Sequence, residues 1–403
     1  MAAMKRILLF PDTNTLSHLT QALAVADWLE ADGFECHLGV SHARMAWATR
    51  FFPRCHPVSE LWDRSGVPFP CLGWFSDRPH IERCLCSQEA LLRQLKPAMV
   101  IGIFDFLSSA SVRDIPLLGI NGFCMLPLYR GVLGYDDRDS PARREQARTL
   151  DRFWTYAARA VTPSLQRRNR PAPVHATEML VGDFNFIYEI PEFWGAPALP
   201  AGYAMIGPVF WDGWDRIGTV PPAAGDDARP IVLLNSGTLP SASTETRRTL
   251  VSELLRRGAR VWVNTGEEGG SEVADRLLCQ PFFSPRAILG RTDLVLCTGG
   301  TGACHQNLAH AVPSLVLPMQ PEQATNGIRL EQLRCGRVLA PSIVFTGRPT
   351  EYARTVDCGH VVRIVDEMLE GRAEYRPPLE RMAAALQGYS ARASICRLAK
   401  RLL

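Results

Sequence analysis

The sequence predicts an α/β protein made of two doubly wound domains, in which helices cover both faces of a parallel sheet. Short apolar runs bounded by turn residues alternate with longer segments of helical period, a pattern typical of βαβ units. A stretch rich in Gly, Pro, Asp and Trp interrupts this alternation at mid-chain, after which it starts again. At 403 residues the chain is also too long for one ordinary core, so we expect two domains.

The first domain opens with a clear strand and helix. Residues 7–10 form an apolar run, a polar loop follows, and apolar side chains then recur at helical spacing from Leu19 to Leu29 until Gly33 ends the helix. Further buried strands are expected at residues 36–40, 99–104 and 116–120. These elements predict an N-terminal sheet within residues 1–207.

A linker is predicted at residues 208–228, where no hydrophobic period is sustained. The second series begins with a strand at residues 231–234, continues with a helix at 244–257 that Gly258 ends, and returns to a strand at 261–263. Strands are also expected at residues 294–296 and 314–317. The second domain is therefore predicted to span residues 229–386.

Composition excludes several classes of protein. With 46% hydrophobic and 21% charged residues, the chain has enough apolar surface for a sizeable core. The net charge of +3 comes from scattered residues, so no nucleic-acid partner is expected. The apolar run near the N-terminus is too short for a signal peptide or a membrane span, which predicts a cytoplasmic protein. The 12 cysteines form no CxxC pair, so we expect buried thiols and no metal site.

The glycine cluster at residues 299–302 lies between a predicted strand and a predicted helix. Glycines at such a turn let the backbone approach an anion closely, and the N–H groups at a helix N-terminus favour negative charge. A pyrophosphate would fit this turn. The same glycines also suit tight strand-to-helix packing without any ligand, so the motif alone leaves both interpretations open.

The segment around this turn resembles the signature of the large GT-B glycosyltransferase family, which includes UDP-glycosyltransferases and macrolide or glycopeptide glycosyltransferases. Residues 298–303 read Thr-Gly-Gly-Thr-Gly-Ala, residues 309–313 read Ala-His-Ala-Val-Pro, and Glu322-Gln323 precede Asn326. Weaker matches are Ser17-His18 in the opening loop, Gly207-Pro208, residues 236–238 and Ser284-Pro285. The match is most specific between residues 293 and 337.

This resemblance implies a GT-B fold, with two Rossmann-like domains that face each other across a central cleft. Residues 1–207 would bind the acceptor and residues 229–386 a UDP- or dTDP-sugar, while the final helix, at residues 387–403, would pack back on the first domain. The implied activity is that of an inverting hexosyltransferase that needs no cofactor beyond its nucleotide-sugar co-substrate. Its acceptor would be the hydroxyl of a small, apolar molecule.

The family's catalytic residues have two counterparts in this chain. His18 matches the family's general base. An imidazole that titrates near neutrality suits removal of a hydroxyl proton. Asp105 resembles in placement the aspartate that orients this histidine, and a carboxylate there would stabilise the imidazolium as it forms. Asp105 is also placed to cap the next helix, so a purely structural role remains open.

The donor site implied by the resemblance lies in the second domain. Ser236, Gly237 and Thr238 match the loop that faces the phosphates, and Phe283 lies in the segment that resembles the base pocket. Glu322 and Gln323 match the pair that binds the donor sugar's hydroxyls. The remaining donor residues are those of the glycine turn: Thr298, Gly299, Gly300, Thr301 and Gly302. The family's phosphate-binding histidine is replaced by Thr298 and a following Thr or Ser by Ala303, which weakens the side-chain part of this site.

Three other interpretations compete with a GT-B glycosyltransferase of this kind. Asp137-Arg138-Asp139 spells the DxD of metal-dependent glycosyltransferases, but it lies in a charged stretch that indicates a solvated loop. A non-hydrolysing sugar-nucleotide epimerase shares the two-domain architecture and would turn over without an acceptor. A catalytically silent helper protein is favoured by Thr298 and opposed by His18, Glu322 and Gln323. Aromatic residues of the first domain, namely Trp74, Phe75, Phe123 and Tyr129, suggest either an apolar acceptor pocket or ordinary core.

Overall fold

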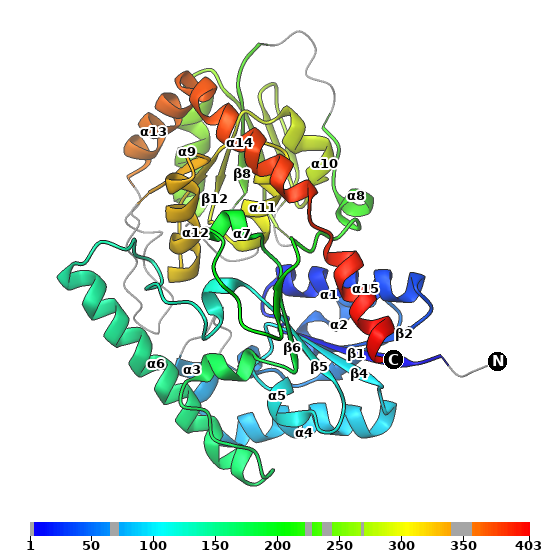
Figure 1. Cartoon of the computed structure of the whole chain (residues 1–403). Helices are drawn as coiled ribbons and strands as arrows, with labels where there is room; N and C mark the ends of the chain where they lie inside the picture. Colours follow the sequence, from blue (N-terminus) through cyan, green and yellow to red (C-terminus); the bar gives the residue numbers. More distant parts are fainter. Residues whose placement is uncertain (1–3, 65–71, 222–227, 236–243, 267–269, 340–356) are drawn as a thin grey trace.

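The computed structural model describes residues 4–64, 72–221, 228–235, 244–266, 270–339 and 357–403. Within these ranges the chain forms two seven-stranded sheets, each with helices on both faces (Figure 1). The predicted α/β class with two doubly wound domains is therefore confirmed.

The first sheet has the strand order β3-β2-β1-β4-β5-β6-β7, and its neighbouring strands all pair in parallel. Its strands are β1 (Arg6–Pro11), β2 (Glu35–Ser41), β3 (Cys55–Val58), β4 (Met99–Ile103), β5 (Leu117–Asn121), β6 (Phe184–Ile187) and β7 (Tyr203–Met205). The order reverses beside β1, which pairs with β2 on one side and β4 on the other. In open α/β sheets a ligand crevice forms at this reversal, outside the carboxyl ends of the strands.

The second sheet has the order β10-β11-β9-β8-β12-β13-β14 and is parallel except for the short β10–β11 pair. Its strands are β8 (Ile231–Asn235), β9 (Arg260–Asn264), β10 (Glu272–Val273), β11 (Leu277–Gln280), β12 (Leu294–Cys297), β13 (Ser314–Val316) and β14 (Gly336–Val338). Here the reversal lies between β8 and β12, so the predicted glycine turn leaves the sheet at its switch point.

Helices cover the sheets and connect their strands. The α-helices are α1 (Leu16–Ala31), α2 (Met45–Ala48), α3 (Leu72–Phe75), α4 (Arg78–Leu95), α5 (Ser108–Ser111), α6 (Pro141–Gln166), α7 (Pro191–Trp194), α8 (Trp214–Ile217), α9 (Thr244–Arg256), α10 (Pro285–Ile288), α11 (Thr301–Ala309), α12 (Pro321–Gln332), α13 (Cys358–Glu370), α14 (Arg372–Gln387) and α15 (Ala391–Leu402). Shorter 3-10 turns are η1 (His42–Arg44), η2 (Leu61–Arg64), η3 (Phe123–Met125), η4 (Ala176–Leu180) and η5 (Leu289–Arg291).

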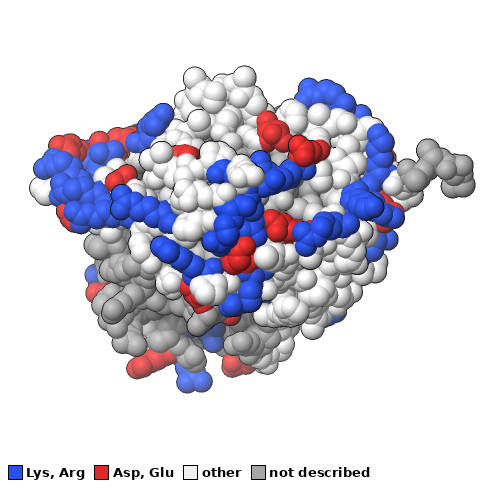
Figure 2. All heavy atoms as spheres, turned by 90° about the horizontal axis from the view of Figure 1, so that it is seen from below, with Lys and Arg blue, Asp and Glu red and all other residues white. Residues whose placement is uncertain are grey.

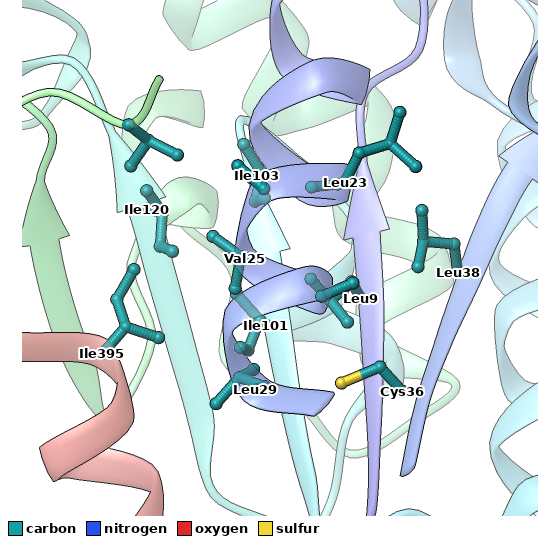
Figure 3. Packing of buried hydrophobic residues seen from close by; sticks show 14 of the residues in the cluster. Leu9, Leu23, Val25, Leu29, Cys36, Leu38, Ile101, Ile103, Ile120 and Ile395 are labelled. Atoms are coloured by element: carbon teal, nitrogen blue, oxygen red, sulfur yellow. The ribbon is translucent and has the colours of Figure 1, made fainter. Parts of the chain in front are cut away.

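Helix α1 is buried on most of its circumference, because it lies between the first sheet and another helix. Leu23, Val25 and Leu29 pack over the side chains that β1, β4 and β5 direct to this face (Figure 3). Gly33, just after the end of α1, has a positive φ of 90°, a conformation that costs glycine little. The dense packing holds the N-terminus of α1 in a fixed place at the crevice.

The last helix, α15, lies against α1 on the first domain (Figure 1). Ile395 and Ala399 are fully buried in the core cluster that also contains α1. Lys400 Nζ lies 2.9 Å from Asp32 Oδ2, at the end of α1. By its contacts, α15 therefore belongs to the first domain.

Charged groups of both signs share the face shown in Figure 2, where Lys and Arg are interspersed with Asp and Glu. On the long helix α6, Arg148 pairs with Glu145 at 2.6 Å, and just beyond it Arg167 pairs with Glu82 at 2.6 Å. Exposed pairs of this kind contribute little to stability. None of the helices in the described ranges is both long and apolar enough to cross a membrane.

Candidate functional site

A cavity of about 260 Å³ lies between the carboxyl edges of the two sheets. From the first domain it is lined by the head of α1, by Phe104 after β4, by the η3 loop and by Tyr188 after β6. From the second it is lined by the glycine turn, the head of α11 and the start of α12. The described lining holds one imidazole, of His18, one carboxylate, of Glu322, and no Lys or Arg.

His18 stands in the first turn of α1, which begins after Thr15 in an extended conformation. Its ring stacks on Phe104, with centroids 4.7 Å apart and planes at 26°. Phe104 itself has a φ of 52°, which is uncommon outside glycine and concentrates at functional sites. Burial lowers the pKa of His18 to about 4, an effect that the Asp12 backbone partly opposes, so the imidazole is neutral at pH 7.

Asp105 lies beyond β4, but its carboxylate is directed to α5 and α4. It accepts hydrogen bonds from the Leu107 backbone at 3.2 Å, from Gln88 Nε2 at 2.9 Å and from Ser108 Oγ. In the described residues Nδ1 of His18 has no hydrogen-bond partner. Asp105 thus holds the turn that leads into α5, whose N-cap is Leu107, and its expected role beside His18 stays a prediction.

The loop from β1 to His18 is held by Glu60, which the sequence did not single out. Its Oε2 accepts from the Thr13 backbone at 2.8 Å, and its Oε1 accepts from Thr13 Oγ1 at 2.7 Å and from the Ser41 backbone at 3.0 Å. Burial and the neighbouring Asp12 raise the pKa of Glu60, while burial raises the pKa of Asp12 to about 8. This network makes the loop rigid where it delivers His18 to the cavity.

The three glycines of the turn after β12 have different roles. Gly299 has a φ of 89°, and a Cβ there would lie 2.5 Å from Val316 Cγ1 and 2.7 Å from the Gln323 carbonyl, so the fold requires glycine. A Cβ on Gly300 would meet nothing within 4 Å, because this residue opens onto the cavity. A Cβ on Gly302 would lie 3.5 Å from Ser17 Oγ, which shows how closely α11 approaches α1.

Glu322 is held in place at the start of α12. Its Oε1 accepts from Thr301 Oγ1 and from Asn326 Nδ2, each at 2.7 Å. Asn326 Nδ2 also lies 2.9 Å from the Gly299 carbonyl and therefore ties the glycine turn to the carboxylate. Burial raises the pKa of Glu322, whereas these hydrogen bonds lower it. Asn326 carried no role in the sequence prediction, yet it joins the two motifs.

The remaining predicted donor residues are placed as follows. Gln323 lines the cavity, and its Oε1 accepts from the Met319 backbone at 2.8 Å. Thr298 lines the cavity and is half-buried, and Phe283 lines it from a buried position beside Trp262. Ser236, Gly237 and Thr238 lie outside the described residues. The structure thus brings His18, the glycine turn, Glu322, Gln323 and Phe283 to one cavity.

Apart from Phe283, the aromatic wall of the cavity was not predicted. Trp74 and Phe75 are core residues with 0% and 1% exposure and are not among the described lining residues, which agrees with the interpretation of them as ordinary core. The described aromatic side chains in the lining are Phe104, Tyr188, Phe210, Trp211, Trp214, Phe282 and Phe283. Two of these, Trp211 and Trp214, come from the stretch identified only as a linker by composition. The presence of two tryptophans in a linker was the sequence signal that could have indicated this wall.

The stretch with the DxD sequence lies in the approach to α6, away from the cavity lining. Asp139 pairs with Arg144, and Asp136 pairs with Arg138, all at the surface. This agrees with the predicted charged loop. In the described ranges, no cluster of three or more His, Cys, Asp or Glu side chains is arranged to hold a metal ion. The cysteines in those ranges are all free thiols.

Comparison with known proteins gives relatives of one kind. No family model matches the chain. Over 412 aligned residues the chain is 24% identical to a PGL/p-HBAD biosynthesis glycosyltransferase of Mycobacterium tuberculosis. The alignment covers 96% of this chain and 89% of that protein. This alignment spans both domains and the linker between them.

Solved structures share the same fold. The glycosyltransferase of kitacinnamycin superposes with a TM-score of 0.72 at 15% identity over 100% of both chains. The spinosyn rhamnosyltransferase SpnG, complexed with spinosyn aglycone, superposes with a TM-score of 0.67 at 15% identity, over 98% of this chain and 100% of that one. The Streptomyces glycosyltransferase SsfS6, complexed with thymidine diphosphate, superposes with a TM-score of 0.64 at 19% identity, over 98% of this chain and 99% of that one. The chain therefore has the GT-B fold of these structures, and its curated relatives identify it as a glycosyltransferase.

Proposed function

We propose that this enzyme is an inverting glycosyltransferase that moves a sugar from a UDP- or dTDP-sugar to a hydroxyl of a small, apolar acceptor. One observation carries the proposal. The head of α1, with His18, and the head of α11, with the glycine turn, open into one cavity, and the Gly302 Cβ position lies only 3.5 Å from Ser17 Oγ. A histidine from one domain thus faces a helix N-terminus from the other, as a general base and an anion-binding site would.

The donor would bind on the second domain. Backbone N–H groups at the start of α11, helped by the hydroxyls of Thr298 and Thr301, would hold the diphosphate and stabilise its charge as it leaves. Phe283 would contact the base. With Oε1 of Glu322 engaged by Thr301 and Asn326, its Oε2 would accept from the sugar hydroxyls beside Gln323. A dTDP donor is supported by the thymidine diphosphate bound to SsfS6.

The acceptor would bind against the first domain and the linker. Phe104, Met125, Val209 and Trp211 form an apolar wall near His18, which suits an apolar acceptor. SpnG, which binds spinosyn aglycone, supports an acceptor of this class.

Transfer would be a single displacement. His18 would take the proton of the acceptor hydroxyl while its oxygen bonds to the anomeric carbon and the bond to the diphosphate breaks, leaving the electron pair on the diphosphate. A pKa of about 4 makes the free imidazole a weak base, but a diphosphate charge brought into the cavity would raise it. Glu322 is the one carboxylate in the described lining and is already held by two hydrogen bonds, so it would position the sugar and not attack it.

The family's missing imidazole at Thr298 provides a test of the donor site. Thr298→Ala is expected to weaken nucleotide binding by only about 0.5–1.5 kcal/mol, the net worth of one hydrogen bond. Thr298→His is expected to hold or improve affinity, because an imidazole N–H can reach phosphate oxygens in a charge-assisted bond. Calorimetric titration with UDP and dTDP measures both. Failure of the wild type and both variants to bind either nucleotide would reject the donor site and favour the helper protein.

Donor activation by a helix N-terminus also predicts how the enzyme responds to chelators. Treatment with EDTA is expected to leave turnover within about twofold, because backbone N–H groups would carry the charge of the leaving group. Release of nucleoside diphosphate, followed with and without added Mg²⁺ or Mn²⁺, measures this. Activity that returned only with the metal would make a divalent ion part of the mechanism.

A further inference from the structure

Helix α12 connects the donor side of the cavity with the first domain. Its start carries Glu322 and Gln323, which line the cavity. One turn further, Thr325 is 3% exposed, and its Oγ1 accepts a hydrogen bond from the Gly134 backbone N–H at 2.8 Å. The same hydroxyl donates to the Pro321 carbonyl at 2.9 Å. A side chain of the second domain thus accepts a hydrogen bond from a backbone group of the first.

A second bond lies on the same flank of α12, four residues along. Arg329 Nε donates to the Phe193 carbonyl, in α7, at 2.8 Å. Positions i and i+4 share one face of a helix, so Thr325 and Arg329 form one seam, in which Thr325 faces the first domain and Arg329 faces α7, whose Phe193 is buried in the core of the second domain. Gly134 meets this seam with a φ of 83°, which glycine adopts without strain.

The first-domain side of this seam leads back to the cavity. The rings of Phe123, Tyr129 and Trp194 pack together, with centroid distances of 5.4 to 5.9 Å. Trp194 follows Phe193, and Phe123 belongs to the η3 loop, which contacts α12 and whose Cys124 and Met125 line the cavity. The loop that ends at Gly134 therefore begins in the cavity wall on the acceptor side.

We propose that Thr325 is a positioning residue that sets the distance between the acceptor wall, defined as residues 122–125, and the sugar-holding pair Glu322 and Gln323. It does so through Gly134, because the hydroxyl anchors the loop to the helix that carries the pair. The inference rests on the proposed function. If the hydrogen bond to Gly134 is lost, the acceptor is expected to be misaligned while the donor still binds. Water then competes with the acceptor for the sugar.

The test compares Thr325→Val, which has nearly the same shape but no hydroxyl, with Thr325→Ser, which keeps the hydroxyl. dTDP-glucose serves as donor and 4-methylumbelliferone as acceptor, and transfer and donor hydrolysis are measured separately. Thr325→Val is expected to raise the ratio of hydrolysis to transfer and the acceptor KM by about tenfold each, because small misplacement of the reacting groups is costly. The Kd for dTDP is expected to stay within about twofold, and Thr325→Ser to behave like the wild type.

Hydrogen exchange supplies a measurement that needs no acceptor. In Thr325→Val, exchange in a peptide covering residues 120–135 is expected to rise, while exchange in residues 320–332 stays as in the wild type. Should Thr325→Val fail to fold, Thr325→Ala, which also removes the hydroxyl that accepts from Gly134, is held to the same expectations.

Two outcomes would overturn the positioning role. The first is an unchanged hydrolysis ratio and acceptor KM in Thr325→Val. The second is an equal loss of activity and melting temperature in the Val and Ser variants, which would mark a structural role. Failure of the proposed function is distinguishable, because the wild type would then bind neither UDP nor dTDP.

Discussion

His18→Ala is expected to lower kcat by about a hundredfold or more while the Kd for the donor nucleotide stays within about twofold. The variant removes the one imidazole in the described cavity lining, and no neighbouring lining group replaces it as a base. His18 stacks on Phe104 in the first domain, whereas the glycine turn that would hold the diphosphate belongs to the second domain, so nucleotide binding is expected to be spared. Single-turnover transfer and calorimetry separate the two effects.

Asp105→Asn is the matched control for this variant. The carboxylate accepts hydrogen bonds from the Leu107 backbone, just before α5, and from Gln88, so an amide in its place is expected to lower the melting temperature more than the rate. A rate loss in Asp105→Asn as large as that in His18→Ala, at unchanged stability, would instead make Asp105 the partner of His18. Comparable activity in His18→Ala and the wild type would remove His18 from the mechanism.

The pH profile of the wild type tests the same assignment. The pKa of His18 is lowered from 6.5 to about 4, so the free enzyme keeps its base neutral well below pH 6 and loses it only as the pH falls through about 4. The acid limb of kcat/KM is therefore expected below pH 5. The same shift makes His18 stabilise the fold above pH 6.5, and that contribution is lost as the pH falls toward 4. An acid limb near pH 6.5 would contradict a buried, neutral imidazole.

Gly299→Ala is expected to lose stability and Gly300→Ala to lose nucleotide binding, although the two residues are adjacent. At Gly299 the new Cβ would clash with Val316 and the Gln323 carbonyl at a φ of 89°, so we expect a loss of about 3 kcal/mol or more of folding free energy. At Gly300, with a φ of −60° and open space, the fold is expected to tolerate alanine. The new methyl group would occupy the place where a diphosphate meets the backbone, which is expected to weaken nucleotide binding by about tenfold or more.

Thermal unfolding and calorimetry of both variants distinguish the two failures. Nucleotide binding by Gly300→Ala at wild-type affinity would show that the turn serves packing only. A Gly299→Ala variant with wild-type stability would contradict the close contacts with Val316 and Gln323.

Much of the fold was predictable because it depends on local pattern. The strand at residues 7–10, the helix that Gly33 ends and the strand before the glycine turn all have the period and the end signals of their element. The seams between elements were not predictable in the same way. Glu60 binds Thr13 across 47 positions and Thr325 binds Gly134 across 191, and no local period records such pairs.

The ambiguous site residues show where local chemistry stops being informative. An aspartate after a strand can cap the next helix or face a histidine, and only the packing of α4 and α5 shows that Gln88, Leu107 and Ser108 engage Asp105. Likewise, Trp211 and Trp214 belong to a linker by composition and to the cavity wall by position.

By itself the sequence determined the two α/β domains, the glycine turn and the histidine at the head of the first helix, since each follows from residues within a few positions of one another. The tertiary structure decided what those parts face. The joining of His18, Glu322 and the linker tryptophans around one cavity depends on how two sheets are set against each other. That arrangement is a sum of contacts between residues up to hundreds of positions apart, which no short stretch of sequence encodes.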